Sequence, residues 1–194
     1  MQKTRNARPR PVTLALLCGL LIAAAPVWSS TAPDVETACL DCHRPQQDRG
    51  AVPVIEGQHA DYLRAQLQRF QQRHREGFPM NALSAGLEAA SLSAMADALA
   101  ARPWRAASSA PQPRADIGRE QLDAFDCASC HGSDFRGGGS IPRIAGQQAA
   151  YLQRQIAAFG ESERHHPPVG GGARMYGITP DAAEAIAAAL AELD

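Results

Sequence analysis

The feature that most constrains this chain is an internal repeat, because each half carries the same cysteine–histidine cluster. The cluster CLDCH at residues 39–43 recurs as CASCH at residues 127–131, 88 positions later. Downstream, the segments PVIEGQHADYLRAQLQRF (53–70) and PRIAGQQAAYLQRQIAAF (142–159) share nine residues in the same order at an offset of 89. A single duplication of this length differs from a solenoid, which stacks several shorter repeats. We therefore expect two similar domains, each folded around its own cluster.

The N-terminal segment has the order of a secretory signal peptide and is set aside from the fold. A basic stretch ending at Arg10 precedes the apolar run at residues 12–25, and small residues follow near Ser29. The run is short for a membrane anchor, which needs about 20 residues. We therefore expect residues 1–29 to be cleaved and the rest to be exported to the periplasm, with an uncleaved anchor as the alternative.

The mature chain is expected to be acidic. Four of the 19 Lys and Arg residues leave with the signal, so 15 arginines remain against 20 Asp and Glu residues, a net charge of about −5. This balance argues against nucleic acid as a partner, because nucleic-acid binding needs a basic surface. This net charge is compatible with peripheral association with a membrane.

Composition and periodicity predict two helical domains joined by a linker. Apolar residues in 58–70 recur at helical spacing, and residues 147–159 repeat the same face. The sequence Thr179-Pro180-Asp181 is typical of a helix start. No segment shows the alternation of a strand, so we predict an all-α fold. We place the first domain at residues 30–103, a Pro/Ser/Ala-rich linker at 104–115 and the second domain at 116–194.

The repeated CxxCH cluster is the attachment signature of c-type haem. Two cysteines on one helical turn can each form a thioether with a vinyl group of the haem, and the adjoining histidine can then bind the iron. A haem would also fill the interior of a domain of this size, which is too small to bury a large core. The sequence thus predicts two haem c groups, with four thioether cysteines and two iron-binding histidines: Cys39, Cys42, Cys127, Cys130, His43 and His131.

Three other interpretations of the cysteines were weighed against haem. A zinc ribbon usually places its CxxC pairs about 15–20 residues apart, which is far closer than they lie here. A disulfide framework does not explain why a histidine follows both pairs. A thioredoxin-like redox pair needs a βαβ context, which the sequence lacks.

A haem iron has a sixth position, and methionines in two corresponding segments are the expected ligands. Met175 is the one methionine after the second cluster, and Met80 lies in what we expect to be the corresponding loop of the first half. We expect Met95 to be a core residue instead, because it lies well inside a predicted helix. A thioether ligand raises the reduction potential relative to bis-histidine ligation. The rival ligands are four histidines: His59, His74, His165 and His166.

A backbone carbonyl is expected to orient each iron-binding histidine. Such a histidine donates its other ring N–H to a fixed acceptor. Pro53 and Pro142 follow His43 and His131 by ten and eleven residues and are well placed to supply it.

Taken together, these features resemble class I cytochrome c domains, and specifically the dihaem cytochrome c4 family. The resemblance covers nearly the whole mature chain and rests on both CxxCH clusters, the PxIxGQxAxYL segments and a methionine ahead of each final helix. It implies two helical bundles, each around one haem with His/Met ligation, and a role in carrying electrons in the periplasm. It also implies positions near the haems or the domain interface for four residues: Gln58, Tyr62, Gln147 and Tyr151.

The two halves depart from each other in ways that predict two unequal haems. Arg44 follows the first cluster, whereas Gly132 follows the second. The step from the shared Phe to the Met is 10 positions in the first half and 16 in the second. We therefore expect two distinct reduction potentials.

The expected function is single-electron transfer without catalysis. The partners implied are a terminal oxidase, a quinol-oxidising complex or a flavoprotein dehydrogenase. The alternative is a dihaem electron-accepting subunit of an enzyme complex, such as a flavocytochrome sulfide dehydrogenase. A haem enzyme such as a peroxidase or thiosulfate dehydrogenase would need an open or unusual sixth site, and a methionine in both halves argues against it.

Overall fold

The structure is a computed structural model that describes residues 34–45, 51–107, 111–166, 175 and 177–194. The predicted signal peptide at residues 1–29 lies outside these described residues. By their contacts, residues 32–194 form one compact unit. Within the described part of the chain, none of the helices has the length and apolar character needed to span a membrane.

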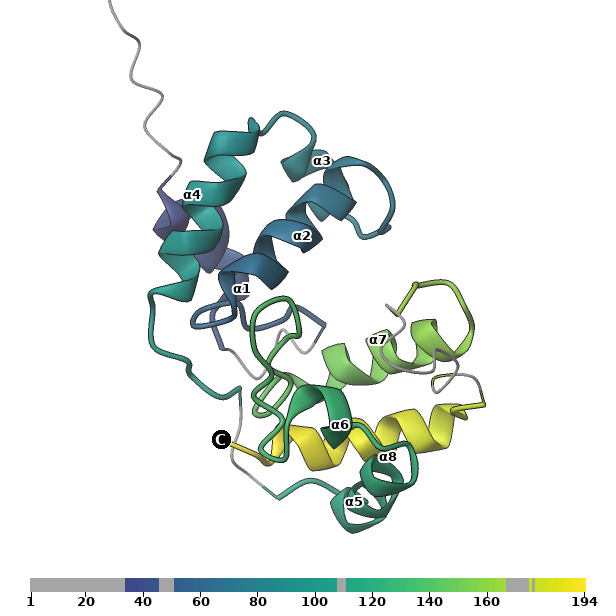
Figure 1. Cartoon of the computed structure of the whole chain (residues 1–194). Coiled ribbons are helices and arrows are strands. Elements are labelled where there is room, and N and C mark those ends of the chain that lie inside the picture. Colours follow the sequence, from purple (N-terminus) through teal and green to yellow (C-terminus); the bar gives the residue numbers. More distant parts are fainter. Residues whose placement is uncertain (1–33, 46–50, 108–110, 167–174, 176) are drawn as a thin grey trace, which may run out of the picture. The chain divides into compact units, whose positions relative to one another are not determined.

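Each half is built from short helices, as the sequence predicts (Figure 1). The first half contains a π-helical turn and four α-helices: η1 (Glu36–Leu40), α1 (Asp41–His43), α2 (Ala60–Gln71), α3 (Met80–Ser84) and α4 (Ala89–Ala100). The second half contains α5 (Ala115–Ala124), α6 (Ala128–His131), α7 (Ala149–Gly160) and α8 (Pro180–Ala191). Among the described residues, the strand-like pairing is limited to an isolated bridge between Gly138 and Ile141.

Local sequence explains where the longest helices begin and which face they bury. The Thr179 hydroxyl accepts a hydrogen bond from the Ala182 backbone N–H at 3.2 Å, and Pro180 occupies the first turn, so α8 begins where the sequence predicts. The repeated apolar face buries Leu63 of α2 and Leu152 of α7. Their equivalence follows the repeat offset of 89.

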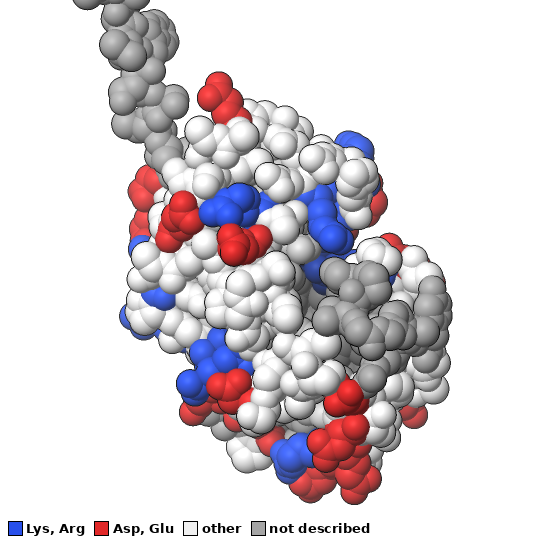
Figure 2. Space-filling model, viewed as in Figure 1, with Lys and Arg blue, Asp and Glu red and all other residues white. Residues whose placement is uncertain are grey.

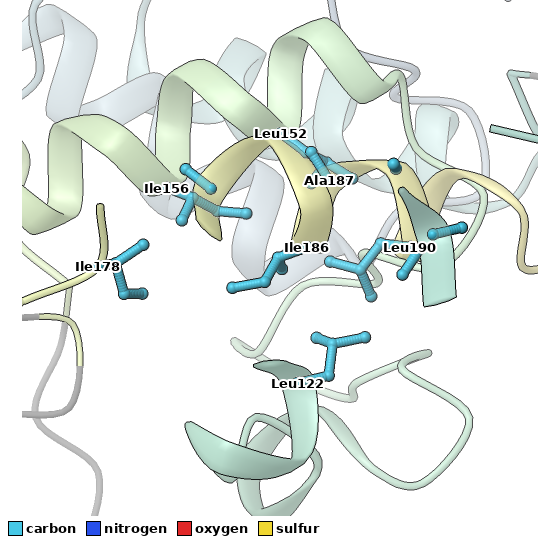
Figure 3. Packing of buried hydrophobic residues seen from close by; sticks show 11 residues of the cluster. Leu122, Leu152, Ile156, Ile178, Ile186, Ala187 and Leu190 are labelled. Carbon is cyan, nitrogen blue, oxygen red and sulfur yellow. The ribbon is translucent and has the colours of Figure 1, made fainter. Parts of the chain in front are cut away.

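The core of the second half lies where α5 and α7 pack against α8 (Figure 3). A helix as rich in alanine as α8 lets its neighbours approach closely. The closest approach is at Gly118 of α5, where a Cβ would lie 1.9 Å from the carbonyl oxygen of Ala185. This core contains eleven buried apolar residues.

The core of the first half is smaller. Its cluster contains four buried apolar residues: Leu40, Leu63, Ala96 and Leu99. Met95 is also buried on α4, as expected for a core residue, and it is 6% exposed. The first half therefore has the smaller described apolar core to stabilise it.

Candidate functional site

The cysteines of each cluster lie on one helical turn. Cys39 is in η1 and Cys42 in α1, while Cys127 caps α6 and Cys130 lies within it. All four are free thiols. Among the described residues, no group of three or more His, Cys, Asp or Glu side chains is placed to hold a metal ion, so the two pairs do not meet as a zinc ribbon requires.

The pKa of the buried thiols does not suit a redox-active cysteine pair. Burial, with a smaller effect from Asp126, raises the pKa of the Cys127 thiol to about 11. Burial and the charge of Asp34 also raise the pKa of Cys39. Thiol–disulfide enzymes lower the pKa of the attacking cysteine so that it is a thiolate. The thioredoxin-like interpretation therefore lacks its main chemical requirement.

Both histidines predicted to bind iron have the backbone partner that the sequence predicts. His43 Nδ1 lies 2.8 Å from the carbonyl oxygen of Pro53, and His131 Nδ1 lies 3.0 Å from that of Pro142. A carbonyl can only accept, so in both rings Nδ1 carries the proton and Nε2 is left as the metal-binding nitrogen. Burial lowers the pKa of both histidines, which favours the neutral imidazole that binds iron.

Gln58 and Gln147 lie between the two halves and are each 3% exposed. The Gln147 side chain pairs with both backbone groups of Val54: it accepts from the N–H at 2.7 Å and donates to the carbonyl at 2.8 Å. The Gln58 side chain pairs in the same way with Arg143, at 2.9 and 2.8 Å. Val54 and Arg143 are themselves equivalent in the repeat, so the two contacts are reciprocal.

A second reciprocal cluster joins the halves around two tyrosines. Arg75 donates to the Tyr151 hydroxyl at 3.0 Å, and Arg164 donates to the Tyr62 hydroxyl at 3.4 Å. Each guanidinium also lies over the ring of the shared phenylalanine of its own half, at 4.4 and 4.6 Å from the centroid. Burial, together with neighbouring Tyr151, raises the pKa of Tyr62.

The arginines of this cluster are residues that the sequence argument did not single out. Arg75 and Arg164 are 89 positions apart, as are Gln66 and Gln155, which accept from both of them. The same offset that relates the two tyrosines would have identified all four.

The candidate sixth ligands are placed differently in the two halves. Met80 was expected in a loop, but it is the first residue of the short helix α3 and is half-buried. Met175 is half-buried against the core of the second half, while the glycine-rich residues 170–174 before it lie outside the described residues. The ring of His166 lies 6.4 Å from that of His131 and 5.0 Å from that of Phe159, measured between centroids.

The other histidines have different surroundings. His59 Nε2 lies 2.8 Å from the carbonyl oxygen of Arg136, so this ring nitrogen already has a hydrogen-bond partner. His74 and His165 are exposed.

The donor set in each half fits a covalently attached haem. Two thiols lie on one turn, and the adjoining imidazole has its Nδ1–H fixed, which leaves Nε2 as the nitrogen that would bind a metal. A small helical bundle with this arrangement defines the class of c-type cytochromes.

Comparison with known proteins identifies the family within this class. The family model for cytochrome c matches residues 115–194. The chain is 31% identical to cytochrome c-552 of Acidithiobacillus ferridurans, over 78% of this chain and 76% of that protein. It is 29% identical to a thiosulfate dehydrogenase electron acceptor of Thiomonas intermedia, over 83% and 80%. The cytochrome c4 structure of Acidithiobacillus ferrooxidans superposes with a TM-score of 0.70 at 28% identity and covers 82% of this chain and 100% of that one.

The chain therefore belongs to the dihaem cytochrome c4-like family. Its all-α fold of tandem cytochrome c domains is that of the solved relatives, and its general role is that of a haem-containing electron carrier.

Proposed function

We propose that this protein is a periplasmic cytochrome that carries two haem c groups and passes single electrons between redox partners without catalysis of its own. The observation that carries the proposal is the pair of fixed histidines. His43 and His131 each hold a proline carbonyl through Nδ1, in two halves that share the same cluster. A duplicated ligand geometry of this kind has no use in a protein with one haem or none.

The proposed haem-binding residues follow the clusters. The thioether cysteines are Cys39 and Cys42 in the first half and Cys127 and Cys130 in the second. His43 and Met80 are the proposed axial ligands of the first iron, and His131 and Met175 those of the second. When bound, each haem supplies an iron that accepts or releases one electron. The protein fixes the imidazole, excludes water and sets the potential through the thioether, which favours Fe(II).

His166 is the competing sixth ligand of the second iron. The rings of His131 and His166 lie 6.4 Å apart between centroids, so an iron held by His131 would lie within reach of His166. The distance in sequence from each methionine to the final helix of its half also differs. Met175 is four positions before the N-cap Thr179, whereas Met80 is eight before the N-cap Glu88.

We also propose the limits of the domains and a periplasmic location. Residues 1–29 are the cleaved signal, residues 30–103 and 116–194 are the two cytochrome domains, and residues 104–115 are the linker. The start of α5 at Ala115, one residue before the proposed start of the second domain at 116, supports that limit to within one residue. Periplasmic export is supported by the signal pattern of residues 1–29.

The partners are proposed to be redox proteins that dock transiently. Acidic and basic side chains are interspersed on the face shown in Figure 2, with acidic groups gathered at the lower edge of the view, where α5 lies. Three carboxylates of α5 are exposed: Asp116, Glu120 and Asp123. Charged groups of both signs on the surface suit the small, short-lived interfaces of electron-transfer encounters.

A thiosulfate-oxidising enzyme is the second candidate donor, besides respiratory complexes. The observation that favours it is the relative named as a thiosulfate dehydrogenase electron acceptor, which aligns with 83% of this chain. In that case the protein would accept electrons and pass them on, again without a catalytic site of its own. No comparable observation favours the flavoprotein partner that the sequence suggested.

Two measurements test the proposal. The exported, mature protein should show a mass excess of two haems over the polypeptide and a pyridine haemochrome spectrum of c type. Its oxidised form should then be reduced by thiosulfate only in the presence of a thiosulfate dehydrogenase if that enzyme is the donor. A colourless protein, with thiols paired or bound to zinc, would overturn the assignment; direct reduction by thiosulfate would overturn the absence of catalysis.

A further inference from the structure

We infer that Gln147 and Gln58 are positioning residues that act across the two halves, each tuning the iron-binding histidine of the other half. The inference rests on the proposed haem ligation. It is carried by hydrogen bonds that converge on two peptide groups.

The first peptide group joins Pro53 to Val54. Its carbonyl oxygen lies 2.8 Å from His43 Nδ1, from which it accepts a hydrogen bond. Its N–H, which belongs to Val54, donates a hydrogen bond to Oε1 of Gln147 at 2.7 Å. One peptide of the first half therefore connects the histidine of that half to a glutamine of the second.

The second peptide group joins Pro142 to Arg143 and has the reverse connection. Its carbonyl lies 3.0 Å from His131 Nδ1, and its N–H is donated to Oε1 of Gln58 at 2.9 Å. A histidine of the second half is thus connected to a glutamine of the first.

The orientation of both carboxamides is fixed by their other bonds. Oε1 of each glutamine also accepts from the N–H of the next residue, His59 or Gln148, at 3.0 and 2.9 Å. Nε2 donates to the carbonyl of Arg143 or Val54. Two N–H donors on one side and a carbonyl on the other admit only one orientation of the amide.

The shared PxIxGQ sequence builds this arrangement locally. The proline supplies the carbonyl, and Gly57 and Gly146 both have φ of +67°, a left-handed conformation that favours glycine. The turn at each glycine precedes the glutamine that crosses to the other half. Burial at 3% exposure keeps water from competing for these bonds.

The expected effect follows from cooperativity between hydrogen bonds. When the N–H of a peptide group donates a hydrogen bond, the carbonyl of the same group is more strongly polarised and becomes a better acceptor. A stronger bond from Nδ1–H makes the imidazole a more basic ligand. A more basic ligand stabilises Fe(III), so each glutamine lowers the potential of the haem in the opposite half.

Leucine variants test the inference through redox titration of the two-haem protein. Gln147→Leu should raise the potential of the first-half haem, and Gln58→Leu that of the second-half haem. Each change should alter the electron distribution between the haems by up to about tenfold, or about 59 mV for a one-electron couple. The haems are assigned with Met80→Ala, which should alter the first alone. A local packing defect would instead affect the haem of the half that carries the variant.

Glutamate variants keep the test decisive if leucine prevents folding, because leucine leaves a buried N–H without an acceptor. Gln147→Glu and Gln58→Glu retain an acceptor oxygen, and a protonated carboxyl can still donate to the carbonyl that Nε2 contacts, so the opposite haem should keep its potential; an ionised carboxylate would lower it. Two bound haems with unchanged potentials in the leucine variants, or a raised potential in the glutamate variants, would overturn the inference while leaving the proposed function intact. A wild-type protein without haem would overturn the proposed function instead.

Discussion

At the scale of single residues, the sixth ligand of the second of the two proposed irons would determine how the two haems differ. A thioether and an imidazole differ in how strongly they favour Fe(III), so the choice between Met175 and His166 sets the order of the two potentials. Both side chains belong to the second half, and His166 is the one whose ring lies near His131.

We expect Met175→Ala to abolish the near-infrared thioether-to-iron band of one haem and to lower its potential, because the thioether that favours Fe(II) is lost. Near-infrared magnetic circular dichroism and a redox titration measure the two effects. His166→Ala is the matched variant and should leave that band in place. If the outcomes are exchanged, so that only His166→Ala alters the second haem, the iron is bound by His131 and His166.

At the scale of helices, the second half depends on the close crossing of α5 and α8. Gly118 makes the crossing possible because it has no Cβ to meet the Ala185 carbonyl. The first half has no described counterpart of this contact before its cluster, since its described residues begin at Asp34.

Gly118→Ala should lower the free energy of unfolding by about 1–3 kcal/mol, the usual cost of overpacking. A Cβ at this position would lie 1.9 Å from a backbone oxygen, which cannot move aside as a side chain would. Chemical denaturation of the haem-loaded protein measures the loss. Gly138→Ala is the control, because a Cβ there meets nothing within 4 Å. Equal stability of the two variants would show that α5 can shift away from α8 at no cost.

Long helices, in which the apolar face repeats several times, could be predicted from the sequence, whereas short helices could not. The 12 residues of α2 and of α7 contain several repeats of the buried face. The five residues of α3 contain barely more than one turn, so no periodicity distinguishes them from a loop, and Met80 was placed in a loop for that reason.

The histidine–proline contacts could also be predicted, because both partners belong to one short segment and the chemistry of haem ligation requires an acceptor. The contacts between halves could not. The repeat relates Gln58 to Gln147 and Arg75 to Arg164, but equivalence says nothing about which residue lies opposite which. That depends on how the two halves pack, and a pattern within one half does not contain it.

At the scale of the whole molecule, each half carries its own proposed haem site, yet the halves are held together by reciprocal polar contacts. A separate site and a shared interface have opposite consequences when one haem is lost. A self-contained site allows one haem to be lost alone, whereas shared contacts transmit the loss to the other half. We expect the size of the core to decide which effect is larger. Among the described residues, the buried apolar cluster has four members in the first half and eleven in the second.

Cys127→Ala combined with Cys130→Ala should therefore yield an exported protein with one haem, attached through the first cluster. Intact-mass spectrometry should show an excess of one haem instead of two. The reciprocal variant, Cys39→Ala with Cys42→Ala, should retain the second haem but be cleaved faster in limited proteolysis, because the first half then has only its small core. Loss of both haems from either variant would mean that the halves mature as one unit, and equal proteolysis of the two would mean that core size does not set their dependence on haem.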